Sequence, residues 1–190
     1  PPMQESLSYN NVSGTVKVSY QPAVNQLIYA SWANGFKSGG INTDRIAPGF
    51  NPVFNPEKSN ALELGLKQDF PEQDLRINLA VHRTDIDDFQ ATTFTGTGFN
   101  LQNAGTIETK GLEVDLTWLP LASTQVTLNF ARTLAHFNEF DNGSCWVAYT
   151  WHTGIDDPGR QLPSDPFCSR AGDRVGFEPQ TRYTLGVEHY

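Results

Sequence analysis

Apolar and polar residues alternate along most of this chain, and this period-two pattern constrains its fold more than any other feature. In residues 12–20, Val16, Val18 and Tyr20 alternate with polar side chains. Successive side chains of a β-strand point to opposite faces, so the pattern predicts strands with one apolar and one polar face. Similar segments recur at residues 27–37, 59–70, 75–82, 111–118, 126–131 and 183–188. We therefore expect an all-β fold of about seven strands; the facing of residues 27–37 stays open, because their first positions are apolar on both sides.

The connections between these segments are alternately short and long. The short links are QPAVNQ, PEQD and LPLASTQ, and the long ones cover residues 38–58, 88–100 and 138–180. In an up-and-down meander this order places every tight turn at one end of the sheet and every long loop at the other. Outer-membrane barrels have the same asymmetry, with short periplasmic turns and long extracellular loops. The sequence thus predicts an antiparallel up-and-down transmembrane β-barrel, incomplete because about seven strands cannot close a wide barrel.

The two faces of the predicted strands differ in chemistry. The last aromatic before each short link lies on the apolar face, and these three, Tyr20, Phe70 and Trp118, are expected to form a periplasmic aromatic girdle. A charge facing lipid at the bilayer midplane costs about 2–4 kcal/mol, so the opposite, charged face is expected to line a wet lumen. Its residues include Lys17, Glu63, Lys67, Glu113, Asp115 and Glu188. A soluble β-sandwich with core aromatics and a solvated face would show the same alternation.

Charge and residue spacing argue against several functions. The net charge of −8 disfavours a nucleic-acid partner, which would require a basic patch. No catalytic constellation and no zinc spacing occurs, so neither an enzyme nor a metal or other cofactor is expected. Asp85 and Asp87 lack the remaining spacing of a calcium loop. Together with the pair Asp156 and Asp157, they are interpreted as solvated acidic side chains.

The third long loop contains both cysteines of the chain, Cys145 and Cys168. In an oxidising compartment a disulfide is favoured over a metal pair or two free thiols, and it would constrain the loop by roughly 3 kcal/mol. Aromatic and cationic side chains in the long loops suit stacking and charge contacts with an anionic aromatic ligand, although packing within the loop is the alternative for each. The candidate ligand-binding residues are Phe36, Lys37, Arg45, Trp146, Tyr149, Trp151 and Arg160.

Several segments together resemble the barrel of TonB-dependent outer-membrane receptors. They are YASWANGFKSGGIN (29–42), NPEKSNALELGLK (55–67), NLAVHRTDIDDFQ (78–90), NAGTIETKGLEVDLTWLP (103–120) and FEPQTRYTLGVEHY (177–190). The resemblance implies a bacterial outer-membrane transporter with a barrel of about 22 strands and a plug domain inside it. Residues 1–190 would then be part of a single barrel domain, with the plug and the true C-terminus elsewhere.

The same resemblance implies what such a chain would bind. A ferric siderophore is the default substrate of the family, and relatives carry cobalamin, sugars or other compounds. The implied partners are outer-membrane lipid, the receptor's own plug domain and TonB, which couples uptake to the energised inner membrane. A soluble secreted β-sandwich that binds carbohydrate through its loop aromatics is the alternative function, and it predicts folding without detergent.

Overall fold

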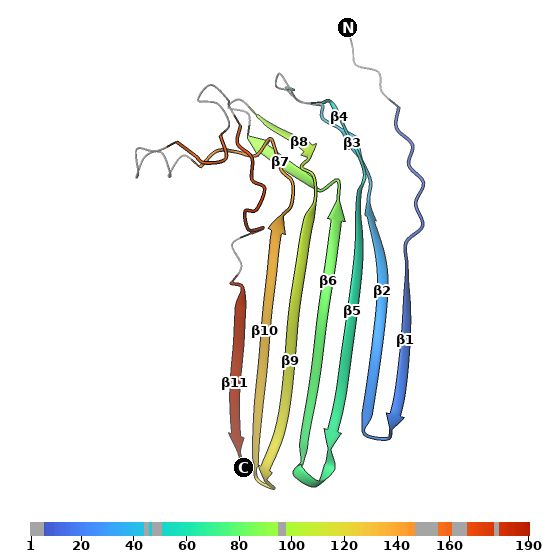
Figure 1. Ribbon diagram of the computed structural model, residues 1–190, viewed down its shortest axis with the longest axis vertical. Coiled ribbons are helices and arrows are strands. Elements are labelled where there is room, and N and C mark those ends of the chain that lie inside the picture. Colours follow the sequence, from blue (N-terminus) through green and yellow to red (C-terminus); the bar gives the residue numbers. More distant parts are fainter. Residues whose placement is uncertain are drawn as a thin grey trace.

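Seven long strands lie side by side in one antiparallel sheet (Figure 1). The computed structural model describes residues 6–43, 46, 51–94, 98–146, 156–160, 167–176 and 179–190. The sheet has the order β1-β2-β5-β6-β9-β10-β11, so the seven predicted strands follow one another as an up-and-down meander. Their bounds are β1 Gly14–Ala23, β2 Gln26–Lys37, β5 Glu57–Phe70, β6 Leu75–Asp87, β9 Ile107–Leu121, β10 Thr124–Phe137 and β11 Thr181–His189. β1 and β11 are the two edges of this sheet, which is therefore an unclosed barrel wall.

Short and long connections alternate as expected. Between β5 and β6 the turn is a 3₁₀ helix at Pro71–Gln73, and Asp74 ends it in the left-handed conformation (φ 47°) that Asp tolerates better than most residues. The described parts of the long connections contain four short strands that the sequence did not reveal. These are β3 Gly40–Ile41, β4 Val53–Phe54, β7 Gln90–Phe94 and β8 Phe99–Asn103, which form two hairpin-like pairs, β3-β4 and β7-β8.

The strand register aligns the apolar side chains into rows that cross the whole sheet. One row runs through Tyr20, Ile28, Leu66, Leu79, Val114, Phe130 and Tyr183. The same register resolves the facing of β2, because Ile28 and Trp32 lie on the apolar face while Leu27 and Tyr29 lie on the other. We call the outward residues of β5, β6, β9 and β10 in these rows the apolar belt: Leu62, Leu64, Leu66, Leu75, Ile77, Leu79, Val81, Leu112, Val114, Leu116, Val126, Leu128 and Phe130.

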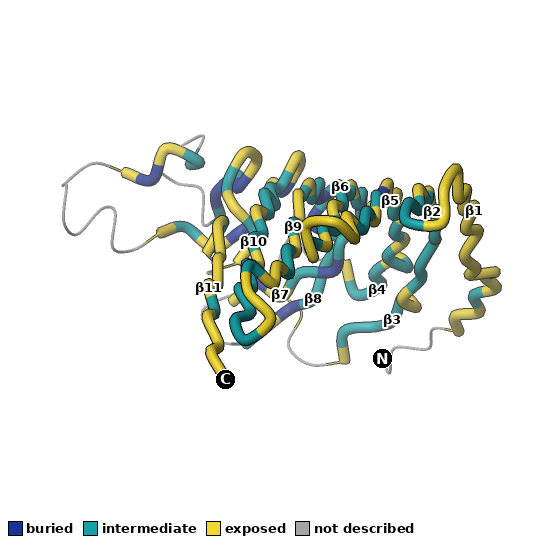
Figure 2. Tube along the Cα trace, turned by 90° about the horizontal axis from the view of Figure 1, so that it is seen from below, coloured by how far each residue is buried: buried dark blue, intermediate teal, exposed yellow. Residues whose placement is uncertain are grey.

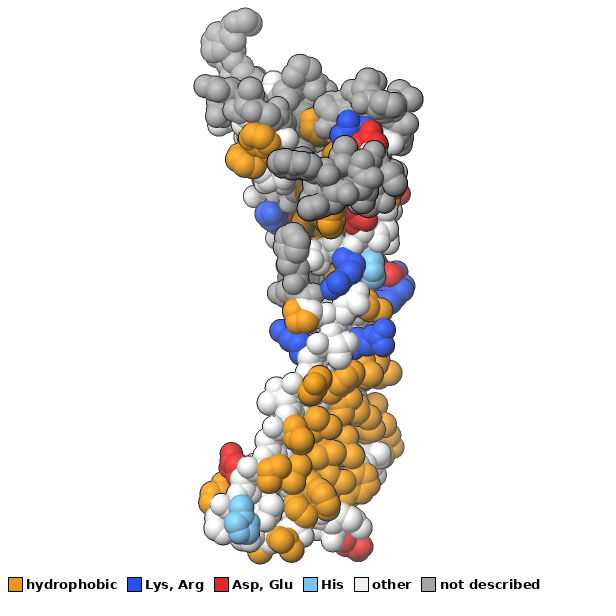
Figure 3. Space-filling model, turned by 90° about the vertical axis from the view of Figure 1, so that its left-hand side faces the viewer, with side chains coloured by type: hydrophobic (Ala, Val, Ile, Leu, Met, Phe, Trp, Pro, Cys, Tyr) orange, Lys and Arg blue, Asp and Glu red, His pale blue; other side chains and the backbone are white. Residues whose placement is uncertain are grey.

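No second layer covers the apolar belt among the described residues. Leu64 is 54% exposed and Val81 is 48% exposed, although both lie in the middle strands of the sheet. Figure 3 shows hydrophobic side chains gathered into one continuous surface toward the turn end of the sheet. A β-sandwich would bury this face against a second sheet, so the soluble sandwich alternative is wrong. No helix in the described part of the chain has the length and apolar character needed to cross a membrane.

The sheet is curved, with the apolar belt on its convex side. Seen along the strands, the four short strands β3, β4, β7 and β8 lie on the concave side (Figure 2). The buried apolar residues that the structure describes lie at the loop end as well, and they are Ala104, Ile107, Phe140 and Cys168. Packing is therefore concentrated at the loop end of the sheet, while the wall itself is a single layer.

Candidate ligand-binding site at the loop end of the sheet

The concave face of the wall carries the charged residues expected to face the lumen. The register places Lys17, Glu63, Lys67, Glu113, Asp115 and Glu188 on the face opposite the apolar belt. The Lys17 ammonium lies 4.1 Å from the centroid of the Tyr29 ring, a cation–π contact. That ring in turn lies over Gly65, where an added Cβ would collide with it. Contact of this face with a plug domain stays a prediction.

The three expected girdle aromatics lie on the convex face near the short turns. Phe70 and Trp118 both flank Leu75 in a single row at the turn end of the apolar belt. Tyr20 pairs with Ile28, two outward positions nearer the loops. This stepped arrangement is expected when strands tilt relative to the membrane normal. Their role as an interfacial girdle stays a prediction.

Side-chain amides join the first and second long loops. Asn42 exchanges two hydrogen bonds with Leu101 of β8, donating from Nδ2 to its carbonyl (2.7 Å) and accepting its N–H at Oδ1 (3.0 Å). Asn103 pairs with Asn55 in the same way, at 3.0 Å and 2.6 Å. Gln90, only 7% exposed, donates from Nε2 to the carbonyl of Ser38 at 2.9 Å and to the carbonyl of Asn55 at 3.0 Å. These amides imitate backbone pairing, so the loops are joined as if by additional strands.

The second and third long loops are also joined. Thr93 Oγ1 and Gln102 Nε2 both donate to the carbonyl of Asn142, at 3.1 and 2.9 Å. Gly143 then pairs with Cys168 through two backbone hydrogen bonds of 3.0 and 2.9 Å. The described parts of the three long loops thus form one hydrogen-bonded body, which we call the loop platform. It consists of residues 38–43, 51–56, 88–94, 98–106, 138–146, 156–160 and 167–176.

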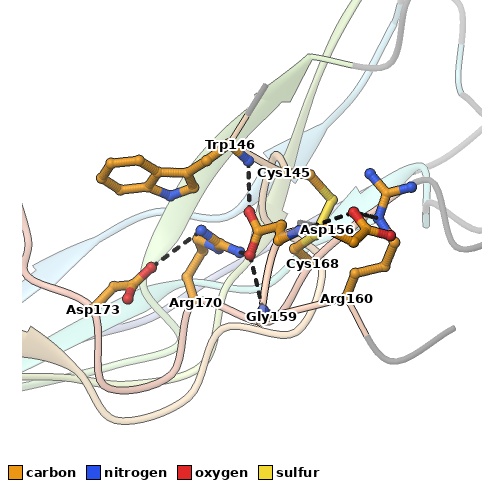
Figure 4. The surroundings of a disulfide bond; sticks show 9 residues. Cys145, Trp146, Asp156, Gly159, Arg160, Cys168, Arg170 and Asp173 are labelled. Atoms are coloured by element: carbon orange, nitrogen blue, oxygen red, sulfur yellow. Dashed lines mark hydrogen bonds and ion pairs between the residues drawn. A yellow bond between two sulfur atoms is a disulfide. The ribbon is translucent and has the colours of Figure 1, made fainter. Parts of the chain in front are cut away.

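The predicted disulfide between Cys145 and Cys168 is confirmed, and a buried ion pair lies beside it (Figure 4). Asp157 is 3% exposed and Arg170 is 9% exposed, with 2.5 Å between a carboxylate oxygen and a guanidinium nitrogen. The Asp157 carboxylate also accepts the backbone N–H of Trp146 at 2.6 Å and of Gly159 at 2.8 Å. A carboxylate with three charge-assisted or backbone donors fixes the path of the chain around it.

The pKa of Asp157 reflects these contacts. Burial raises the pKa, but the hydrogen bonds from the Arg170 guanidinium and from two backbone N–H groups lower it by more. The pKa of this carboxyl therefore lies below its usual range. The interpretation of Asp157 as a solvated acidic residue is wrong, because the folded loop encloses it with its own cation.

The described candidate ligand residues lie in different environments. The Trp146 indole is 55% exposed, and Figure 4 shows it directed away from the disulfide. Arg160 forms an ion pair with Asp156 at 3.2 Å and keeps 25% of its side chain exposed. Lys37, at the end of β2, lies 3.9 Å from Glu57. Phe36 pairs with Lys58 and so shares the convex face with Trp32, away from the loop platform.

The other three candidates, Arg45, Tyr149 and Trp151, lie outside the described residues. Ligand binding by any of the seven stays a prediction. The sequence did not identify the residues that assemble the loop platform, such as Gln90, Asn42 and Arg170. Their signal in the sequence is weak, because isolated amides and arginines in long loops are common and their partners are 13 to 59 positions away.

A metal site is not indicated among the described residues. Cys145, Asp157 and Cys168 bring their ligand atoms within 4.8 Å of one another. Both thiols are consumed by the disulfide, however, and the carboxylate is held by Arg170. What the platform offers instead is a firm surface of backbone and amide groups with an exposed indole, which suits non-covalent recognition.

The fold is shared with solved outer-membrane receptors of low sequence identity. The ferric yersiniabactin uptake receptor FyuA from Yersinia pestis is 20% identical with a TM-score of 0.60, over 93% of this chain and 22% of that one. The ferric-catecholate import receptor Fiu from E. coli K12 is 17% identical with a TM-score of 0.57, over 93% and 22%. The alcaligin outer-membrane receptor FauA from Bordetella pertussis is 15% identical with a TM-score of 0.55, over 95% and 26%.

This chain therefore spans about a fifth to a quarter of the length of those receptors. The match to a protein family covers almost the whole chain. The family described as TonB dependent receptor-like, beta-barrel, matches residues 4–190. The alternating strands, the open meander and the apolar convex face agree with that match. The chain belongs to the TonB-dependent receptor β-barrel family of the Gram-negative outer membrane.

Proposed function

We propose that this chain forms a wall segment and part of the ligand-binding loops of an active importer, with a ferric siderophore as the leading substrate and TonB as the source of energy. The loop platform carries the proposal. Side-chain amides and a threonine hydroxyl join the three long loops, a disulfide and a buried ion pair brace the third, and the short strands of the first two lie on the concave side of the wall. A preorganised surface loses little conformational entropy when it captures a ligand.

The chemistry of the exposed loop residues favours an anionic, aromatic ligand. The Trp146 indole offers a stacking surface, and Lys37 and Arg160 offer positive charge at the platform and its margin. Arg45, Tyr149 and Trp151 would add to this set. Two of the receptors of similar fold are named for the uptake of ferric yersiniabactin and of ferric catecholates, which supports the choice of substrate class. Phe36 is left out of the proposed surface because of its position on the convex face.

The two faces of the wall suggest the remaining partners. The apolar belt would contact outer-membrane lipid, and the charged concave face would contact the plug domain of the complete receptor. Residues 1–190 would then be one part of a single barrel domain. The chain would take part in transport without bond chemistry, as is usual for a family of transporters.

Uptake by the complete receptor tests this proposal. We expect it to restore growth of a receptor-deleted strain on a ferric siderophore under iron limitation. Trp146→Ala should raise the Kd for that siderophore about 3- to 30-fold, which corresponds to roughly 0.5–2 kcal/mol for one cation–π or stacking contact. Trp32→Phe, which alters an aromatic on the convex face, is the matched control and should leave the Kd unchanged.

The outcomes separate the parts of the proposal. Growth on cobalamin or a sugar instead of any ferric siderophore would retain the importer and overturn the substrate class. Uptake that continues after removal of TonB would overturn the energy coupling. A complete receptor that binds none of these compounds and restores no growth would overturn the importer itself.

A further inference from the structure

The junction between the second and third long loops is built on an Asn-Gly dipeptide. The backbone carbonyl of Asn142 accepts the Thr93 hydroxyl at 3.1 Å and the Gln102 amide at 2.9 Å. The next residue, Gly143, pairs with Cys168 through two backbone hydrogen bonds. Two consecutive residues therefore carry the contacts to the second loop and the contacts across the third.

An asparagine followed by glycine is the dipeptide most prone to spontaneous deamidation. The backbone nitrogen of the glycine attacks Cγ of the asparagine, the Cγ–Nδ2 bond breaks, and the amide group leaves as ammonia with the proton of the attacking nitrogen. Water then opens the resulting succinimide ring at either carbonyl, which gives aspartate or isoaspartate. Glycine favours ring closure because it has no Cβ to obstruct the approach. The reaction needs only water.

The folded loop combines an exposed electrophile with a restrained nucleophile. Asn142 is exposed, and its side-chain amide makes no hydrogen bond to the described residues. Gly143 is buried, and its N–H donates to the Cys168 carbonyl at 3.0 Å. The glycine nitrogen cannot lose its proton and turn toward Cγ without first breaking that bond. Deamidation therefore requires local opening of the loop, as amide hydrogen exchange does.

The disulfide controls this opening. Cys168 is the backbone partner of Gly143 and the covalent partner of Cys145, which lies two positions after that glycine. Arg170 adds to the restraint, because its side chain packs against Gly143 where an added Cβ would meet it. The disulfide thus holds in place the carbonyl that binds the glycine N–H, and its loss would release the nucleophile.

The other Asn-Gly pair of the chain, Asn34–Gly35 in β2, is protected differently. Its asparagine side chain is held at both ends, because Oδ1 accepts the N–H of Gly14 at 2.8 Å and Nδ2 donates to the carbonyl of Val12 at 2.8 Å. Both residues of this pair also lie within the pairing of β2 with β5. Their protection does not involve the disulfide, so this pair is an internal reference.

We propose that Asn142–Gly143 is a deamidation site that the disulfide keeps latent, and that its conversion to isoaspartate separates the second loop from the third. In isoaspartate the main chain runs through the former side-chain carboxyl group, which adds one methylene between the two residues. The contacts of the first residue and the pairing of the second then fall out of register. The proposal concerns the covalent chemistry of the chain itself and does not rest on the proposed function.

Deamidation in the complete receptor tests the proposal. Folded receptor in detergent is incubated at mildly alkaline pH, and peptide mapping by mass spectrometry follows the reaction at Asn142 and Asn34. When opening and closing are fast, the rate is proportional to the open population. Loss of a disulfide across 23 positions should raise that population about a hundredfold, so Asn142 should react about a hundredfold faster in C145S/C168S than in the wild type. Asn34 should react slowly in both proteins.

Hydrogen exchange then measures the consequence for the loop platform. Asn142→Gln retains the backbone carbonyl that joins the loops, but its longer side chain cyclises far more slowly. After incubation, protection of residues 98–106 should be lower in C145S/C168S than in the same variant that also carries Asn142→Gln. Equal protection in the two proteins would overturn the proposed separation of the loops.

The rates provide the remaining checks. Equal deamidation of Asn142 in wild type and C145S/C168S would overturn the role of the disulfide. Equal rates at Asn142 and Asn34 in the variant would also overturn the proposal, because the reaction would then follow general unfolding. Heat-modifiable mobility checks folding; if the variant does not fold, reduction of the folded wild type with a phosphine should accelerate the reaction at Asn142 by the same factor, and an unchanged rate would overturn the proposal.

Discussion

Replacing Arg170 with leucine would leave the Asp157 carboxylate buried and without a cation. The two side chains are almost enclosed and lie 2.5 Å apart beside the disulfide. Removing one member of a buried ion pair costs about 3–5 kcal/mol, because the remaining charge is desolvated and uncompensated. For comparison, the disulfide that closes the same loop across 23 positions contributes about 3 kcal/mol in the chain-entropy model. Losing the pair should therefore loosen the third loop as much as losing the disulfide.

Native-state hydrogen exchange measures this effect locally, where a melting curve of the whole barrel would not. In the complete receptor, protection of peptides within residues 138–146 and 167–176 should fall by about a hundredfold to a few thousandfold in Arg170→Leu. Arg160→Leu is the matched control, because its partner Asp156 is 45% exposed, and it should change protection by less than about fivefold. Asp157→Asn combined with Arg170→Leu should recover part of the loss. Equal protection in Arg170→Leu and wild type would show that the buried ion pair does not stabilise the third loop.

The same pair predicts a pH dependence. Because the folded-state pKa of Asp157 is lowered, its carboxylate stabilises the loop at pH values above the ordinary aspartate pKa. That stabilisation is lost as the pH falls through the lowered pKa. Protection of the third loop should therefore decrease as the pH falls below about 4, the ordinary aspartate pKa, and Asp157→Asn should remove that decrease. A decrease of the same size in the asparagine variant would assign the effect to other groups.

Two further predictions concern the wall and a loop turn. Leu79→Arg on the convex face should lower the free energy of unfolding of the receptor by about 2–4 kcal/mol, measured by reversible unfolding from bilayers. Ala80→Arg on the concave face should lower it by less than about 1 kcal/mol. Equal losses would contradict the assigned faces. Gly105→Ala should lower the protection of residues 98–106 more than Gly172→Ala lowers that of its own loop. Both glycines have a positive φ, but only at Gly105 would an added Cβ meet the backbone of Glu139, and equal losses would exclude that collision as the cause.

The wall was predictable from sequence because each strand carries its own signal. Alternation within residues 59–70 and 75–82 predicts both the strands and the faces that their side chains occupy, and the tetrapeptide PEQD between them predicts the turn. Only β2 was ambiguous, since Leu27, Ile28 and Tyr29 are all apolar. There the facing is decided by the neighbours, because Ile28 lies between Tyr20 and Leu66 across the sheet.

The loop platform was not predictable in the same way. Asn42 bonds to Leu101 and Thr93 to Asn142, contacts that join separate loops and depend on the strands having already brought them together. The disulfide was the exception, because two cysteines in one loop have few alternatives. Arg170 illustrates the limit: nothing in its sequence neighbourhood identifies Asp157, 13 positions away, as its partner, and in the structure the two form a buried ion pair.

We expect the convex face of this wall to contact lipid and the concave face to contact water or the plug domain. A nitroxide scan of residues 77–82 on β6, in the complete receptor reconstituted into bilayers, distinguishes the two faces. Lipid-soluble oxygen should relax nitroxide labels at Ile77, Leu79 and Val81, which lie on the convex face. It should not relax labels at Asn78, Ala80 and His82 on the concave face, and any collision with a water-soluble nickel reagent should occur at these concave positions. Oxygen accessibility without this period of two, or with the two sets exchanged, would show that lipid does not cover the convex face.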